Sequence, residues 1–186
     1  MRQDKLALRG VLTLAIAALG WMAPTPDLTG TDGPKEPAAY YLAGNDAVAP
    51  EPEVVSVAQE DKSFRPNLVA VSVGSTVEFP NRDDTVHNVY GPKGGALGFF
   101  DLGSAEKTKP DGSNLLTKEI SEKGVVKISC AIHPVMKGNI VAVPSQFHTV
   151  STDGTYEFSS VPAGEYDVMV MTTDGEVSKL KTVQID

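Results

Sequence analysis

One segment joins a strand pattern to a cluster of soft donor side chains, and it constrains the fold more than any other. Apolar and polar residues alternate over residues 124–130, which predicts a half-buried strand with side chains on alternate faces. Val126, Ile128 and Cys130 then share the inward face. The strand runs into the sequence CAIHPVM, residues 130–136, so the only cysteine of the chain lies where a core strand becomes a loop.

This loop places a thiolate, an imidazole and a thioether at the spacing C-x2-H-x2-M. Cys130 has no disulfide partner within the chain, since it is the only cysteine. Thiolate and thioether ligands favour copper, and two His, one Cys and a weak axial Met describe a blue-copper site. The second imidazole must come from His87 or His148, and His87 is favoured because it follows an alternating apolar stretch that ends at Phe79.

Other interpretations of the same residues are open. A single cysteine is often a small buried hydrophobe, and an isolated His or Met is often structural. A catalytic Cys–His pair needs an oriented base and a third group, for which His133 is poorly placed on a tight loop. Structural zinc normally takes four Cys or His ligands. The combination at this spacing favours copper, and without an acid–base pair or substrate motif the sequence does not predict an enzyme.

Together these residues resemble the cupredoxins, most closely the amicyanin and plastocyanin branch. The short C-x2-H-x2-M loop is similar to the amicyanin type, and the stretch from Phe64 to Asn81, followed by His87 and Asn88, is similar to the first half of such domains. The resemblance covers residues 54–144. It implies an all-β fold: a Greek-key cupredoxin β-sandwich, here followed by a small β-sandwich-like module.

The resemblance also implies a site. Asn88 matches the asparagine that ties the two ligand loops together, and Pro134 resembles the residue after the histidine in the amicyanin loop, where it removes one backbone N–H. Ala131 stands where related domains often carry Ser or Thr, so a backbone group must replace that side-chain bridge. His148 is expected to be a surface histidine. One type 1 copper ion per chain is expected on four ligands: His87, Cys130, His133 and Met136.

The expected function is single-electron transport between redox partners. The partner is expected to be a redox protein, such as a c-type cytochrome or a dehydrogenase, that docks near His133 on a monomeric protein. A copper storage or delivery protein without an electron-transfer role is the alternative. The net charge of −8 argues against nucleic-acid binding. An acidic surface can steer association with a basic partner, although solubility alone is a simpler explanation of the charge.

Residues 1–23 read as an export signal or an N-terminal anchor. Arg2, Lys5 and Arg9 form a basic start, and the apolar stretch over residues 10–23 is too short to span a membrane comfortably. We therefore expect a periplasmic or otherwise exported protein, attached to a membrane only if this segment is not cleaved.

Two further segments flank the expected cupredoxin domain. Residues 24–53 hold six of the 13 prolines and show no apolar periodicity, which predicts a disordered linker. Residues 145–186 predict a small β module, with a hairpin turn at residues 151–155 between strands at 147–150 and 156–158. This tail resembles carboxypeptidase regulatory-like or transthyretin-like modules, which implies a structural or interaction role, and it is short enough to share a core with the preceding sheet.

Overall fold

The computed structural model describes residues 27–186, which form strands, one short 3₁₀ turn and no α-helix. The all-β fold class is confirmed. Within this part of the chain no helix is long and apolar enough to cross a membrane. The segment 1–23 lies outside the described residues, so its role as a signal or anchor stays a prediction.

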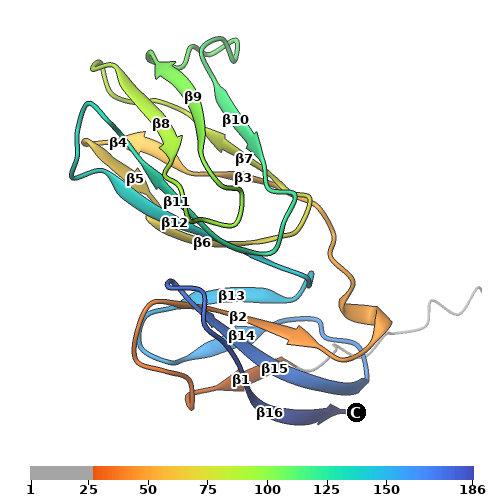
Figure 1. Ribbon diagram of the computed structural model, residues 1–186. Coiled ribbons are helices and arrows are strands. Elements are labelled where there is room, and N and C mark those ends of the chain that lie inside the picture. The colour runs from red at the N-terminus through yellow and green to blue at the C-terminus, as the bar shows by residue number, and fades with distance from the viewer. Residues whose placement is uncertain (1–26) are drawn as a thin grey trace, which may run out of the picture.

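The strands form two bodies that lie one above the other in Figure 1. The upper body holds a three-stranded sheet ordered β10-β7-β3, a five-stranded sheet ordered β6-β12-β11-β8-β9, and the small hairpin β4-β5. Neighbouring strands are antiparallel except for the parallel pairs β3–β7 and β6–β12. The strands are β3 (Val54–Ser56), β4 (Ala58–Glu60), β5 (Ser63–Arg65), β6 (Leu68–Ser72), β7 (Thr76–Phe79), β8 (His87–Gly91), β9 (Phe100–Ala105), β10 (Leu116–Glu119), β11 (Gly124–Ser129) and β12 (Lys137–Val143).

The core of the upper body lies between its sheets. Val126, Ile128 and Cys130 are buried together in it, so the inward face predicted from the alternation is confirmed. Phe64 and Phe79 pack edge to face there, with ring centroids 6.4 Å apart. Burial of these apolar side chains stabilises the sandwich and fixes the end of β11 at which the cysteine lies.

The lower body holds a four-stranded sheet ordered β13-β2-β15-β16 and a two-stranded sheet ordered β1-β14. Its own core includes the stacked rings of Tyr40 and Tyr156, whose centroids are 5.1 Å apart. The elements are β1 (Leu28–Gly30), β2 (Ala38–Ala43), the 3₁₀ turn η1 (Asp46–Val48), β13 (His148–Ser151), β14 (Tyr156–Phe158), β15 (Gly164–Thr172) and β16 (Val177–Ile185).

The disordered linker expected over residues 24–53 is wrong for much of its length. β2 is a central strand, hydrogen-bonded to β13 on one side and β15 on the other, and residues 38–42 are buried. The sequence AAYYLA shows no alternation because both faces of β2 are covered, and a fully buried strand reads as a short apolar run. The surrounding prolines and glycines obscured it.

The hairpin expected around residues 151–155 is also wrong. β13 pairs with β2 and β14 pairs with β1, so the turn carries the chain from one sheet to the other. Asp153 makes the turn by accepting hydrogen bonds from the Thr155 backbone N–H at 3.0 Å and from the Ser151 hydroxyl at 2.8 Å. The turn signal predicted the reversal of the chain correctly, but such a signal does not determine which strands pair.

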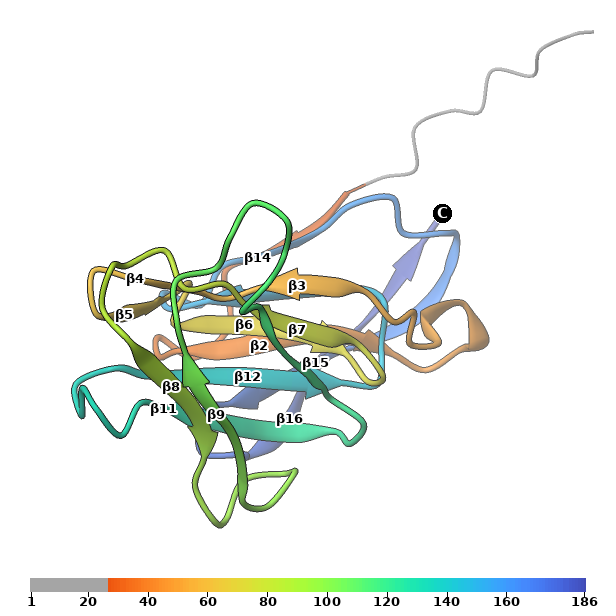
Figure 2. The same ribbon diagram turned by 90° about the horizontal axis from the view of Figure 1, so that it is seen from above.

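The two bodies share a third core. The outer face of the five-stranded sheet packs on the four-stranded sheet, where residues 39 and 41 of β2 and Met171 of β15 meet residues of β6, β11 and β12 (Figures 1 and 2). The five-stranded sheet is therefore covered on both faces. The buried members of this core are Ala39, Tyr41, Ala70, Val125, Val141, Val143 and Met171.

Candidate metal centre

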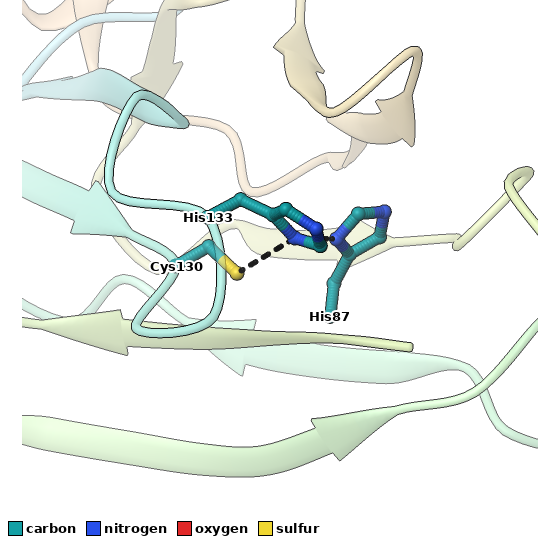
Figure 3. A group of neighbouring side chains, drawn as sticks. All are labelled: His87, Cys130 and His133. Atoms are coloured by element: carbon teal, nitrogen blue, oxygen red, sulfur yellow. Dashed lines mark hydrogen bonds between the residues drawn. The ribbon is translucent and has the colours of Figure 1, made fainter. Parts of the chain in front are cut away.

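Three side chains from two strand ends converge at one end of the upper body. His87 begins β8, Cys130 follows β11 directly, and His133 lies on the loop between β11 and β12. His87 Nδ1 lies 2.9 Å from His133 Nδ1, and Cys130 Sγ lies 4.0 Å from that same His133 Nδ1 (Figure 3). The three donor atoms all lie within 4.8 Å of one another, a spacing that allows them to hold a single metal ion.

The cluster is buried on one side and reaches solvent on the other. His87 is fully buried and Cys130 is 1% exposed, whereas His133 is partly exposed. Its neighbours Ile132 and Val135 are 51% and 85% exposed. His133 is thus the side chain of the cluster closest to solvent, and it lies within an apolar part of the surface.

The loop is closed by its own backbone. The Cys130 N–H donates to the Met136 carbonyl at 3.2 Å, and the Met136 N–H donates to the His133 carbonyl at 2.9 Å. Met136 is buried in the same core as Cys130, while Pro134 is exposed on the loop. Of the four expected ligands, the structure brings three into one cluster and buries the fourth side chain at the end of the loop.

Asn88 joins the two segments that carry the cluster. Its side-chain Oδ1 accepts a hydrogen bond from the Ala131 N–H at 2.6 Å, and its own N–H points at Cys130 Sγ at 3.5 Å. The backbone of Ala131 thus takes the place of the hydroxyl bridge that this position lacks.

Sequence reasoning missed Asp83, which lies on the buried side of His87. Asp83 Oδ2 is 2.8 Å from His87 Nε2, and it also accepts the Lys62 N–H at 3.0 Å. Burial acts to raise the pKa of Asp83, but the Lys62 amide and His87 together with the Asp61 amide bring it below its ordinary value. The only sequence signal was an acidic residue four positions before the histidine, in a loop without periodicity.

The surroundings of His133 favour the uncharged form that a metal ligand needs. Its pKa is lowered by desolvation, then by the neighbouring His87 and Lys62, while Asp83 acts in the opposite direction. An imidazole must be unprotonated at the nitrogen that binds a metal. The environment of His133 therefore favours metal binding.

His148 lies outside the cluster, but it is not the surface histidine that we expected. Its side chain is only 13% exposed and its Nε2 lies 3.0 Å from Glu53 Oε1. Desolvation lowers the pKa of His148, and the charge of Glu53 opposes that shift. Burial at the junction of the two bodies accounts for the difference, because β13 lies beside the segment that leads into β3.

The donor set fits copper. Two imidazoles and a thiolate from a buried cysteine are intermediate to soft ligands, whereas magnesium and calcium need oxygen donors. The Met136 thioether at the end of the loop is a ligand type that zinc sites rarely use and copper sites do.

Comparison with known proteins gives matches to solved structures only. No protein-family model and no curated protein matches the chain. A reduced amicyanin mutant is 24% identical over 54% of this chain and 86% of its own, with a TM-score of 0.43. An oxidized amicyanin mutant is 21% identical over 56% of this chain and 98% of its own, with a TM-score of 0.44. The reduced Cu(I) form of a third mutant is 26% identical over 52% and 86%, with a TM-score of 0.42.

Proposed function

We propose that this chain is an exported cupredoxin-type protein that binds one type 1 copper ion and carries single electrons between redox partners. The observation that supports the proposal best is the convergence of His87, Cys130 and His133 on one point. The C-x2-H-x2-M spacing of the loop supports it independently. Copper bound there supplies one-electron redox chemistry.

The residues around such a centre have separate roles. His87, Cys130 and His133 provide three strong donors, and we assign Met136 as the weak fourth ligand from the family resemblance. The buried side of the cluster excludes water, and the Asn88 hydrogen bonds hold both ligand segments in place. A prearranged donor set needs little rearrangement when an electron arrives or leaves, which suits a carrier. With four ligands from the protein, no position remains for a substrate, so we do not propose an enzyme.

The partner is proposed to be another redox protein, such as a c-type cytochrome or a dehydrogenase, that docks over His133. Three exposed apolar side chains near the cluster support this site: Val86, Ile132 and Val135 are 43%, 51% and 85% exposed. All three are within two residues of His87 or His133 in the sequence, and exposed apolar surface beside a site often marks an interaction surface. We propose a monomer that works in the periplasm or another exported location, because residues 1–23 read as an export signal.

The decisive measurement is the absorption spectrum of the purified protein after addition of one equivalent of Cu(II). We expect an intense visible thiolate-to-copper band that saturates at one copper per chain. The band should disappear on reduction and return on reoxidation without loss of metal. Absence of the band would reject a type 1 centre, and loss of the metal at each reduction would favour the delivery alternative.

A further inference from the structure

His87 has two ring nitrogens with different surroundings. Nδ1 faces the cluster, 2.9 Å from His133 Nδ1, and Nε2 faces Asp83 Oδ2 at 2.8 Å. The ring is fully buried, so no water competes for Nε2. In a neutral imidazole one nitrogen carries the proton and the other offers a lone pair, and the choice depends on the hydrogen bond that each makes.

Asp83 is itself held by an unusual turn. The loop between β4 and β5 consists of Asp61 and Lys62, which have φ values of 53° and 55°, as a type I′ hairpin turn requires. Neither residue is a glycine, although the left-handed region is costly for other side chains. Their two successive N–H groups point at the carboxylate, Asp61 N–H to Oδ1 at 2.9 Å and Lys62 N–H to Oδ2 at 3.0 Å.

The loop that leads to His87 is fixed from its other end as well. The Asp83 N–H donates to Asn81 Oδ1 at 2.9 Å, and the Asn81 side chain donates to the Thr85 and Ala105 carbonyls at 2.9 and 2.8 Å. Asn81 is buried, so these bonds do not exchange readily with water. The carboxylate position is therefore determined by both the hairpin turn and the loop.

Resting on the proposed copper function, we propose that Asp83 is a positioning residue of the metal centre, placed by the Asp61–Lys62 turn. The Asp61 and Lys62 N–H groups donate to its two oxygens and stabilise the ionised carboxylate, which can only accept hydrogen bonds, so Nε2 of His87 donates to it. Nε2 then carries the proton, and the Nδ1 lone pair faces Cys130 and His133. The negative charge behind His87 also makes the imidazole a stronger donor and stabilises Cu(II) relative to Cu(I).

The first test is the tautomer of His87, measured by long-range ¹H–¹⁵N NMR on metal-free protein at neutral pH. The wild-type protein should carry the proton at Nε2, and a proton at Nδ1 would overturn the proposal. This measurement requires neither copper nor a variant. It therefore stays decisive if the copper spectrum described above is absent, which would reject only the proposed function.

The second test compares Asp83→Asn with Asp84→Asn. Both remove one carboxylate, but Asp84 is exposed and pairs with Lys107 at the surface, so Asp84→Asn controls for the change in net charge. In Asp83→Asn the single amide oxygen that remains cannot accept all three N–H groups, which weakens the hold on His87. Loss of a partner behind a metal ligand typically lowers metal affinity about 10–100-fold.

We expect Cu(II) affinity to fall at least about tenfold more than Cu(I) affinity in Asp83→Asn, which raises the midpoint potential by about 59 mV for a one-electron couple. The potential of Asp84→Asn should stay near that of the wild type. Equal potentials in the two variants would overturn the proposal. If Asp83→Asn does not fold, as far-UV circular dichroism would show, the wild-type tautomer alone decides.

Discussion

Cys130 is the residue on which the copper proposal depends most. Its sulfur is buried beside two imidazoles and faces the Asn88 N–H. Cys130→Ser should abolish the visible thiolate-to-copper band completely, because the hydroxyl that replaces it gives no such transition. The fold should survive, since the substitution exchanges sulfur for oxygen at one position. Absorption and far-UV circular dichroism on the same sample check both expectations, and a band that persists would show that another group is the ligand.

His87 and His148 are the two candidates for the second imidazole ligand, and their alanine variants form a matched comparison. His87→Ala should remove the visible band or reduce it strongly, because His87 Nδ1 lies inside the cluster. His148→Ala should leave the band unchanged, because His148 pairs with Glu53 outside it. His148→Ala removes a largely buried imidazole and its contact with Glu53, so a lower unfolding temperature with an intact spectrum is also expected. The opposite spectral pattern would place the ligand in the lower body.

At the scale of single residues, the sequence predicted much of the candidate site. The C-x2-H-x2-M spacing identified Cys130 and His133, and the family resemblance selected His87 and Asn88. The sequence could not predict Asp83 as a partner of His87. The position of Asp83 depends on the turn between β4 and β5, which lies more than 20 residues before it in the chain. The sequence also did not indicate the contact between His148 and Glu53, because the segment around Glu53 meets β13 only in the folded molecule.

At the scale of elements, alternation predicted several strands of the upper body. Residues 69–73 and 76–79 lie largely in β6 and β7, and the inward side of β11 is confirmed. Alternation did not predict β2, whose sequence AAYYLA shows none, and the turn signal did not predict how β13 and β14 pair. Local patterns report burial and chain reversal, whereas strand order depends on segments distant in sequence.

A pair of glycine variants tests whether the turn between β13 and β14 packs against the N-terminal segment of the described chain. Gly154 has a φ of 88° and lies beside Gly33 of the segment between β1 and β2. A Cβ added to Gly154 would lie 2.4 Å from the backbone oxygen of Gly33. Gly175 has a φ of 96° with nothing within 4 Å of such a Cβ, so it is the matched control. Gly175→Ala should cost about 1–2 kcal/mol from the left-handed backbone alone.

Gly154→Ala should cost clearly more, because it adds a backbone clash to the same conformational penalty. The free energy of unfolding in urea measures both variants. Equal losses in the two variants would show that residues 33 and 154 do not pack as described.

At the scale of the whole molecule, the five-stranded sheet is an inner layer. Its outer face carries the apolar residues that meet the lower body. If the two bodies were separated, each would expose apolar side chains to water on that side. The lower body is also assembled from both ends of the described chain, with β1 and β2 from one end and β13–β16 from the other. The resemblance of the tail to carboxypeptidase regulatory-like modules stays a prediction, and its proposed role is to support the sheet that carries the candidate metal ligands.

Deletion of residues 145–186 tests whether the two bodies are separable. The deletion removes β13 and β15, the two neighbours of β2, and uncovers the apolar residues Val125, Val141 and Val143 of the inner sheet. An apolar sheet face and an unpaired strand edge promote aggregation. We therefore expect the shortened chain to be largely insoluble, and any soluble fraction to unfold without a sharp transition.

The intact protein should instead unfold as one cooperative unit. Far-UV circular dichroism follows the strands of both bodies, the visible copper band follows the upper body alone, and the shared core should make the two transitions coincide in urea. Val141→Ala, a truncation at the shared core, should then lower the midpoint of both probes together by the same amount, with a cost of about 1–3 kcal/mol from the lost apolar burial. If the copper band held its wild-type midpoint while only part of the circular dichroism signal shifted, the bodies would fold independently, and the lower body would be an attachment to the metal-binding domain rather than one wall of its core.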